Sequence, residues 1–312
     1  MRILVTGGAG FIGSNVADRF LALGHDVAVL DNLSTGRVEN VDPRVKFYKA
    51  DLIDRAGIDK AIEDFRPEIV DHHAAQIDVR HSVEAPVFDA TTNILGGIGL
   101  LEACVRHGVR KLIYASTGGA LYGEGKQLPA TEEHPAHPES PYGVSKLSFE
   151  HYVYCFRLIH GLDATVLRYP NVYGPRQNPH GEAGVNAIFI GLMSEGKAPT
   201  IFGDGSQVRD YLYVDDVVRA NELALTKGSG ATVNLGWGKG VSVNDIVRHL
   251  KEILDFKGDA IYAAGRPGEV QKIYLDATRA GEVLGWKPEV TFDEGLRRTV
   301  AWYKGERVAG RR

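Results

Sequence analysis

The chain has 312 residues, 44% hydrophobic and 24% charged, a balance that is typical of a folded globular protein and excludes a disordered one. Its net charge of −4 argues against a broadly basic surface for nucleic acid or an anionic membrane, and its two cysteines form neither a disulfide framework nor a zinc cluster. We therefore expect about two domains, or one large α/β domain with an added part, in a cytoplasmic protein without a leader or membrane span. Glycine is in excess, at 37 residues against an average of about 7%.

The first half alternates short apolar runs with amphipathic stretches, which predicts strands and helices in turn. Strands are expected at 2–6, 26–30, 45–48, 68–72, 111–115 and 164–168. Helices are expected at 14–23, 58–65, 91–107 and 141–160. Such alternation indicates an α/β fold with a doubly wound parallel sheet, which binds ligands at the carboxyl ends of its strands.

A glycine-rich turn, TGGAGFIG at residues 6–13, joins the first strand to the first helix. Glycines here permit a tight turn and close approach of a diphosphate to the backbone, and the helix amino end supplies free N–H groups. Asp31 follows 18 residues after Gly13, at the end of the second strand, where an acid can bind the adenosine ribose hydroxyls. Because a carboxylate repels a 2′-phosphate, the pattern favours NAD over NADP. Asp51 and Leu52, after the third strand, are candidates for the adenine edge.

A tyrosine and a lysine lie four residues apart in the helix expected at 141–160, so Tyr142 and Lys146 share one helix face. An ammonium beside a phenol favours the phenolate, which allows such a tyrosine to act as acid or base. The spacing alone is weak evidence, because Tyr122 and Lys126 repeat it within a glycine-containing loop.

Together these motifs resemble the extended short-chain dehydrogenases/reductases, and among them the bacterial and archaeal UDP-glucose 4-epimerases. The resemblance rests on TGGAGFIG, DNLSTG at 31–36, HHAAQIDVRHS at 72–82 and SPYGVSK at 140–146. It extends through RYPNVYGPRQ at 168–177, GDGSQVRDYLYVDDV at 203–217 and RPGE at 266–269. It therefore covers essentially the whole chain.

The resemblance implies a Rossmann NAD-binding domain over 1–168, to which residues near 210–235 return. It also implies a smaller, interleaved substrate domain over most of 169–312. The implied cofactor-binding residues are Gly7, Gly10, Phe11, Ile12, Asp31, Asn32, Ser34, Thr35, Gly36, Asp51, Leu52, His73, Ala74, Ala75, Gln76, Tyr142, Lys146, Tyr169 and Val172. The implied substrate-binding residues are Thr117, Tyr142, Asn171, Arg209, Arg266, Glu269 and Ile273, with the two arginines neutralising a diphosphate.

The implied reaction interconverts UDP-glucose and UDP-galactose by transient oxidation at C4, with Tyr142 as the acid and base and Lys146 as its cationic neighbour. The third catalytic member is where the sequence departs from the family. Many epimerases place a hydroxyl two residues after the first serine of this motif, where this chain has Gly118. We expect Thr117 to take over the hydroxyl role, with Ser116 as the alternative. Since Gly118-Gly119 supplies none of the acids that dehydratases use there, the motif favours epimerisation.

The resemblance also bears on substrate range and assembly. Isoleucine at 273 is smaller than the tyrosine that blocks an N-acetyl group in the family, so UDP-N-acetylglucosamine is an expected second substrate. A UDP-glucuronate 4-epimerase and an NAD-dependent nucleotide-sugar oxidoreductase remain alternatives. A homodimer is expected, with Gly96, Gly97 and Gly99 allowing close helix packing at its interface. No metal site is expected, and the pathway implied is galactose metabolism.

Overall fold

A computed structural model describes residues 1–125, 127–179, 184–265 and 270–308. Seven strands form one sheet in the spatial order β11-β6-β5-β4-β1-β2-β3, and every neighbouring pair is parallel. The strands are β1 (Arg2–Thr6), β2 (Asp26–Asp31), β3 (Lys46–Lys49), β4 (Ile69–His72), β5 (Lys111–Thr117), β6 (Asp163–Tyr169) and β11 (Thr232–Asn234). This confirms the predicted α/β fold with a doubly wound parallel sheet.

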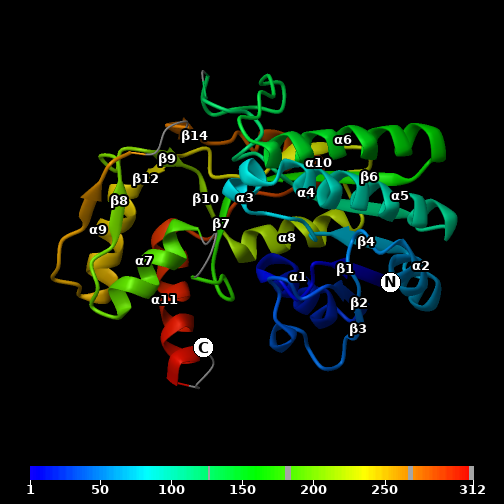
Figure 1. Ribbon diagram of the computed structural model, residues 1–312, viewed down its shortest axis with the longest axis horizontal. Helices are drawn as coiled ribbons and strands as arrows, with labels where there is room; N and C mark the ends of the chain where they lie inside the picture. Colours follow the sequence, from blue (N-terminus) through cyan, green and yellow to red (C-terminus); the bar gives the residue numbers. More distant parts are fainter. Residues whose placement is uncertain (126, 180–183, 266–269, 309–312) are drawn as a thin grey trace.

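Helices cover both faces of this sheet (Figure 1). On one face lie α1 (Phe11–Ala22) and α8 (Val214–Ala224); on the other lie α2 (Arg55–Phe65), α5 (Gly97–Arg106) and α6 (Pro141–His160). Because side chains alternate along a strand, Ile3 and Val5 of β1 enter the core with α1 and α8, whereas Leu4 enters the core with α2, α5 and α6. Three short segments precede α5: α3 (Val79–Glu84), α4 (Pro86–Ala90) and the π-helix η2 (Thr91–Gly96).

The second half builds a smaller region beside the carboxyl edge of the sheet (Figure 1). Its strands are β7 (Asn171–Tyr173) with β10 (Tyr211–Tyr213), β8 (Thr200–Phe202) with β13 (Ile261–Ala263), and β9 (Val208–Arg209) between β12 (Val241–Ser242) and β14 (Lys272–Ile273). Its helices are α7 (Val185–Ser194), α9 (Val243–Leu254) and α11 (Phe292–Val308). Helix α10 (Thr278–Leu284) packs instead on β11 and α8 of the large sheet, and a 3₁₀ turn, η1 (Val38–Asn40), follows β2. One apolar cluster runs from β1 into α7, α9 and α11, so the two regions share a core.

Helix α6 has the bounds that the sequence predicts, because its ends carry strong local signals. The Ser140 hydroxyl accepts a hydrogen bond from the Gly143 N–H at 3.1 Å, and Pro141 occupies the first turn. Gly161 ends the helix with a φ of 70°, a left-handed conformation that glycine adopts without strain. Helix α1, in contrast, begins at Phe11 rather than at the predicted residue 14, because the glycine turn leads directly into it.

The predicted helix over 91–107 differs more. Helical structure begins with α4 at Pro86, five residues before the predicted start. The next segment, η2, has π-helical hydrogen bonds, and α5 continues from it to Arg106. The glycines at this point serve contacts within the chain. A side chain at Gly97 would lie 2.4 Å from the Phe149 ring of α6, and one at Gly96 would lie 2.9 Å from the Leu52 Cβ. Their expected place at a dimer interface is therefore wrong for these two residues, because both are buried under neighbouring elements.

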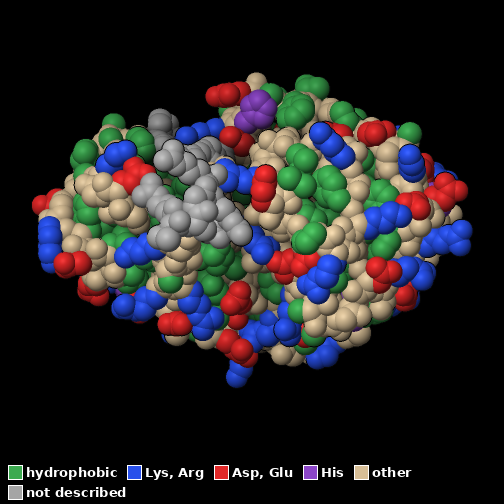
Figure 2. All heavy atoms as spheres, turned by 90° about the horizontal axis from the view of Figure 1, so that it is seen from below, with side chains coloured by type: hydrophobic (Ala, Val, Ile, Leu, Met, Phe, Trp, Pro, Cys, Tyr) green, Lys and Arg blue, Asp and Glu red, His purple; other side chains and the backbone are tan. Residues whose placement is uncertain are grey.

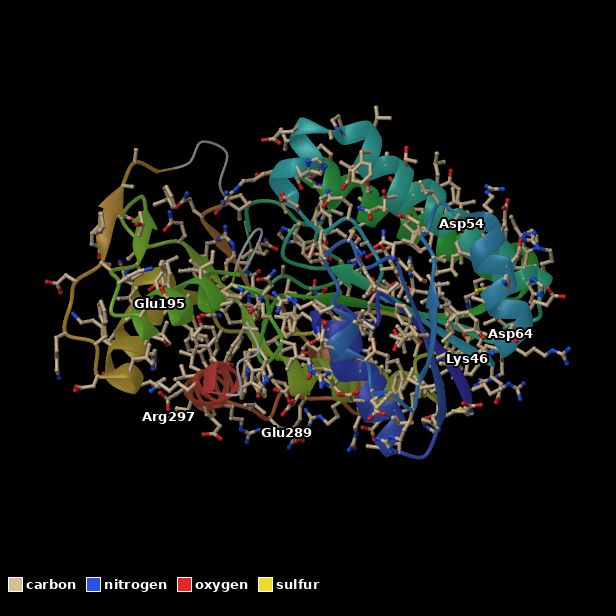
Figure 3. The ribbon with its side chains drawn as sticks, turned by 60° about the horizontal axis from the view of Figure 1, so that its bottom comes forward. Lys46, Asp54, Asp64, Glu195, Glu289 and Arg297 are labelled. Carbon is tan, nitrogen blue, oxygen red and sulfur yellow. The ribbon has the colours of Figure 1, made fainter. Side chains whose placement is uncertain are left out.

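The surface carries no single dominant charge on the face seen from below, where basic and acidic side chains are interspersed among the described residues (Figure 2). Figure 3 shows one such pair, Lys46 and Asp64, at the β3 edge, with their charged atoms 2.6 Å apart. In the parts of the chain that the structure describes, none of the helices is long and apolar enough to cross a membrane.

Candidate active site

The glycine turn after β1 forms a cradle that a larger residue would fill. Gly7 has a φ of 68°, and a Cβ there would lie 2.6 Å from the backbone nitrogen of Ala74. A Cβ at Gly13 would lie 2.3 Å from the carbonyl oxygen of Gly7. Gly10 precedes α1, and no described side chain caps that helix end. The N–H groups of Phe11 and Ile12 in the first turn of α1 therefore suit a diphosphate, as the dinucleotide motif requires.

Asp31 lies beside this cradle at the carboxyl end of β2. Its carboxylate accepts hydrogen bonds from the Ala9 N–H at 3.0 Å and the Leu33 N–H at 2.8 Å. These two bonds fix the carboxylate against the glycine turn, and a Cβ at Gly36 would lie 3.0 Å from it. A fixed negative charge here fits the ribose of NAD and disfavours the 2′-phosphate of NADP.

The segment between β2 and η1, together with the end of β3, closes the adenosine side of the cradle. The Asn32 side-chain amide donates to the Asp51 carboxylate at 2.6 Å, and the Asn32 Oδ1 accepts from the Ser34 N–H at 2.8 Å. Thr35 is exposed, and Leu52 is buried against Gly96. Asp54, rather than Asp51, caps α2 (Figure 3), so the Asp51 side chain is not used as a helix cap.

The segment after β4 forms the opposite wall. The N–H of His73 donates to the Thr6 carbonyl oxygen at 3.1 Å, and Ala74 lies against Gly7. Ala75 is half-buried, and Gln76 is held by Asn93 of η2 through two hydrogen bonds of 2.8 and 2.9 Å. The ends of β1, β2, β3 and β4 thus bring the predicted cofactor residues around one cradle, and their donors and shape fit NAD.

Tyr142 and Lys146 face β5 from the first two turns of α6. The Lys146 ammonium lies 5.9 Å from the centre of the Tyr142 ring and donates to the Ala115 carbonyl oxygen at 2.9 Å. Burial lowers the pKa of Lys146 to about 8, although Asp89 and Glu150 act in the opposite direction.

Burial and the negative charge of Asp89 raise the pKa of Tyr142. The protein groups by themselves therefore do not favour the phenolate, in contrast to what the Tyr142–Lys146 spacing predicts. Desolvation of the phenolate exceeds the attraction of the neighbouring ammonium. The oxidised nicotinamide of NAD supplies a further positive charge and a hydride acceptor when it is bound.

The two candidate hydroxyls on β5 have different partners. The Ser116 hydroxyl is buried and donates to the Glu150 carboxylate at 2.5 Å. The Thr117 hydroxyl oxygen accepts from the Ala120 N–H at 3.2 Å, within the turn that follows β5. That turn packs on α6, because a Cβ at Gly143 would lie 2.5 Å from the Ala120 carbonyl oxygen.

The glycines of this turn explain why the chain departs from the family pattern. A Cβ at Gly118 would lie 2.3 Å from the Leu275 side chain, so the leucine fills the space that a hydroxyl-bearing residue needs. A Cβ at Gly119 would lie 3.1 Å from the Asn171 side-chain oxygen, which places the predicted substrate residue beside the turn.

The predicted substrate residues are only partly brought together. Asn171 joins β10 through its N–H, which donates to the Asp210 carbonyl oxygen at 3.0 Å. The Arg209 guanidinium donates to the carbonyl oxygens of Val208, Val270 and Gln271. Arg266 and Glu269 lie outside the described residues.

The other residues on this side are largely buried. Tyr169 stacks on His73 and bonds to Asn221, and Val172 is half-buried in the main core. Ile273 is 2% exposed and packs with Leu121, Tyr122, Ala130 and Leu275.

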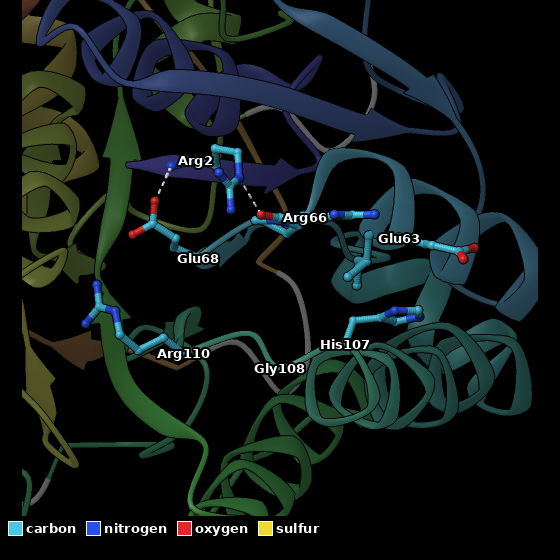
Figure 4. A pocket seen from close by; sticks show the side chains of 9 residues that line it. Arg2, Glu63, Arg66, Glu68, His107, Gly108 and Arg110 are labelled. Carbon is cyan, nitrogen blue, oxygen red and sulfur yellow. Dashed lines mark hydrogen bonds between the residues drawn. The ribbon is translucent and has the colours of Figure 1, made fainter.

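A separate hollow lies at the opposite, amino end of the strands, between Arg2, Arg66, Glu68, His107 and Arg110 (Figure 4). Arg2 already donates to the Arg66 carbonyl oxygen and, through its N–H, to Glu68. This position is the wrong edge of a parallel sheet for its ligand site. Among the described residues, no cluster of three or more histidines, cysteines and acids could hold a metal ion.

Comparison with known proteins places this geometry in a family. Residues 3–236 match the NAD dependent epimerase/dehydratase family. The chain belongs to this family. Membership confirms the predicted resemblance to the extended short-chain dehydrogenases/reductases and NAD as the cofactor.

Three relatives are similar to the chain over almost its whole length. A putative UDP-glucose 4-epimerase of Methanocaldococcus jannaschii is 48% identical and covers 97% of this chain and 98% of its own. The UDP-glucose 4-epimerase of Thermotoga maritima, solved with UDP-glucose, is 50% identical with a TM-score of 0.96, and the match covers 98% of this chain and 99% of its own. The UDP-glucose 4-epimerase of Thermus thermophilus, solved with NAD, is 46% identical with a TM-score of 0.94, and this match also covers 98% of this chain and 99% of its own.

Several buried polar residues of the site were not predicted from the sequence. Asp89 lies under Tyr142 and Lys146, and the Glu150 carboxylate bonds to the Arg168 guanidinium at 2.6 Å. Asp210 joins three segments of the substrate region. The only signal for them is a polar residue within or beside an apolar element, which does not identify the partner.

Asp210 generates a prediction about pH and stability. It is 2% exposed, accepts hydrogen bonds from the N–H groups of Trp237, Gly238 and Leu275, and burial raises its pKa to about 7. Its folded pKa is thus above its unfolded value of about 4. Its contribution to the free energy of unfolding is therefore complete below about pH 4 and is lost as pH rises to about 7.

Asp210→Asn keeps one oxygen for the three N–H donors and removes the titration. Urea unfolding between about pH 4.5 and 8 should show a flatter pH dependence in this variant, by on the order of a few kcal/mol across the range. Asp204→Asn, at an exposed acid that bonds to Ser206, is the control. Equal pH dependence in wild type and Asp210→Asn would contradict the assignment.

Proposed function

We propose that the chain is a UDP-glucose 4-epimerase that interconverts UDP-glucose and UDP-galactose with retained NAD. The carrying observation is that Tyr142 and Lys146 face a β5 turn whose Gly118 and Gly119 lack the acid used for dehydration. The NAD cradle at Gly7, Gly13 and Asp31 and the names of the three relatives support the same reaction.

In this mechanism the protein moves one proton and holds two molecules in place. Tyr142 takes the proton from the sugar 4-hydroxyl and returns it to the same oxygen after the hexose has turned. The hydride that bound NAD accepts from C4 would return to the opposite face of that carbon. Lys146 stays close enough to stabilise the phenolate, at 5.9 Å from the ring centre. Arg209, with Arg266, neutralises the diphosphate, so the nucleotide is held firmly while the hexose can turn.

Thr117 is the better candidate for the catalytic hydroxyl. Its oxygen accepts from the Ala120 N–H, which leaves its own proton free to be donated to the sugar oxygen. Ser116 already donates its proton to Glu150, on the side of β5 that faces α6. Its role is therefore to hold the helix.

A homodimer is proposed from an apolar surface on α4, η2 and α6. Large apolar side chains that gather on a surface mark an interaction site, and here Val87, Leu95, Leu158 and Ile159 are 58–79% exposed. Because α4 and η2 pack beside α6, these side chains are spread along adjacent helical elements, which a second copy would cover symmetrically. We further place the enzyme in the cytoplasm and in galactose metabolism.

The reaction is tested by incubating purified protein with UDP-galactose, without added NAD, and separating the products. UDP-glucose should form, and Tyr142→Phe should lower kcat by about 10²- to 10⁴-fold because the acid and base is lost. Net reduction of added NAD without epimerisation would instead indicate an oxidoreductase. Turnover of UDP-glucuronate alone would indicate the other epimerase.

The hydroxyl assignment is tested by two variants. Thr117→Val should lower kcat by roughly 10²-fold, with Thr117→Ser restoring most of it. Ser116→Ala should keep turnover but lower the free energy of unfolding by about 1.5–3 kcal/mol, because a hydrogen bond to a charged group is lost. Full turnover in Thr117→Val would overturn the assignment.

The substrate range is tested with the acetylated sugars. Ile273 leaves more room than a tyrosine, so wild-type enzyme should interconvert UDP-N-acetylglucosamine and UDP-N-acetylgalactosamine as well as the unsubstituted pair. The ratio of kcat/KM for the two pairs is the measurement. Good activity on UDP-galactose with none on the acetylated pair would contradict this expectation.

The dimer is tested by sedimentation equilibrium. Wild type should sediment at twice the mass of one chain, and Leu158→Glu with Ile159→Glu should give monomers because charges would be buried at the interface. Ile261→Glu, at an exposed residue of β13, is the matched control. A monomeric wild type would refute the proposal.

A further inference from the structure

A buried carboxylate lies behind the catalytic pair and connects three elements. Asp89, on α4, is 0% exposed. One of its oxygens accepts from the Ser145 hydroxyl of α6 at 2.5 Å. The other accepts from the Gln76 side chain at 2.9 Å and the Asn93 side chain at 3.1 Å. These three partners are all neutral donors.

These contacts fix the position of α6 relative to the segment after β4, which forms one wall of the NAD cradle. Ser145 directly precedes Lys146 in the helix, and Gln76 lies in the predicted cofactor segment. Asn93, in the π-helical turn η2, also binds the backbone of Gln76. Its side-chain oxygen accepts from the Gln76 N–H, and its amide group donates to the Gln76 carbonyl oxygen. The amino end of α6 is held in addition by Ser82, whose hydroxyl oxygen accepts from the Tyr142 N–H at 3.2 Å.

We propose that Asp89 is a positioning residue for catalysis, which holds Tyr142 and Lys146 in register with the cofactor segment and places a buried carboxylate against the turn of α6 that carries Lys146. Of the measurements below, only the activity assay rests on the proposed epimerase function. Asp89 itself touches neither reacting group, so its effect must pass through Ser145 and through its charge.

The charge effect has a physical basis in the surroundings of Lys146. Asp89 from α4 and Glu150 from α6 are the acids that act on it, whereas the Arg168 guanidinium neutralises Glu150. Tyr142 and the ring of Tyr114 on β5 also face it. His72 on β4 stays neutral, since burial and Lys146 lower its pKa well below the usual range. Asp89 raises the pKa of both Lys146 and Tyr142.

Two variants separate position from charge. Asp89→Asn can keep all three contacts, with its oxygen accepting from Gln76 and Asn93 and its amide donating to Ser145, while the charge is lost. Ser145→Ala keeps the charge and its contacts to Gln76 and Asn93, while the connection to α6 is lost. Asp64→Asn is the control, at an acid of α2 that is 49% exposed (Figure 3).

The charge is measured on NAD-loaded protein labelled with ¹³C,¹⁵N-lysine, in which the Lys146 signal is identified by its absence in Lys146→Arg. Asp89→Asn should lower the Lys146 titration midpoint by about one pH unit and move the alkaline limb of kcat by the same amount. Ser145→Ala should leave this midpoint unchanged and lower kcat about tenfold at constant KM. Asp64→Asn should change neither quantity.

An unshifted Lys146 midpoint in folded Asp89→Asn, or an unchanged kcat in Ser145→Ala, overturns the proposal. Should Asp89→Asn not fold, Ser145→Ala still decides it. The lysine titration needs no substrate, so a wild type that is inactive on every UDP-sugar would refute the proposed function while leaving the charge effect measurable.

Discussion

The buried ion pair between Glu150 and Arg168 is the contact on which the arrangement of the catalytic groups depends. Glu150 lies one turn after Lys146 on α6, and Arg168 lies near the end of β6, so the pair fixes the helix over the sheet. Ser116 on β5 donates to the same carboxylate, and the Arg168 guanidinium also donates to the Tyr122 hydroxyl at 2.7 Å. Two buried charges cost solvation free energy, and removing either one leaves the other unpaired. The arrangement is therefore intolerant of small changes, which suits a site that must hold a phenol beside a cofactor.

Helix α6 is fixed at two levels by different chemistry. An ion pair anchors its middle, whereas neutral donors around Asp89 and the Ser82 hydroxyl anchor its first turns. The hydrogen-bond partners of Asp89 are neutral, and its carboxylate raises the pKa of Lys146. The substrate side is built differently, from strands of two or three residues joined by turns. A rigid cofactor side and a substrate side of short elements are what an epimerase needs, because the hexose must turn while NAD stays in place.

The sequence predicts local features well and distant partnerships poorly. The bounds of α6 follow from Ser140, Pro141 and Gly161, and the NAD cradle follows from glycines within one turn. The network at Asp89 joins residues 76, 89, 93 and 145, and no spacing rule relates a helix of one unit to a loop of another. The single turn α4 is not predicted from the sequence, so the predicted helix begins at 91 rather than at Pro86, and the π-helical hydrogen bonds of η2 have no sequence signal of their own. Likewise, the sequence offers two adjacent hydroxyls, and only their partners distinguish Ser116 from Thr117.

The glycines at 118 and 119 show how packing and chemistry constrain one another in this fold. Leu275 is 1% exposed and occupies the space beside Gly118, so a hydroxyl-bearing residue at 118 would require the leucine to move. Leu275 cannot move freely, because its N–H donates to Asp210 and its side chain packs with Ile273. The proposed catalytic hydroxyl is therefore that of Thr117, whose oxygen accepts from the Ala120 N–H. A change at 118 would thus have to be accompanied by a smaller residue at 275, since the position of the hydroxyl depends on the packing of the substrate region.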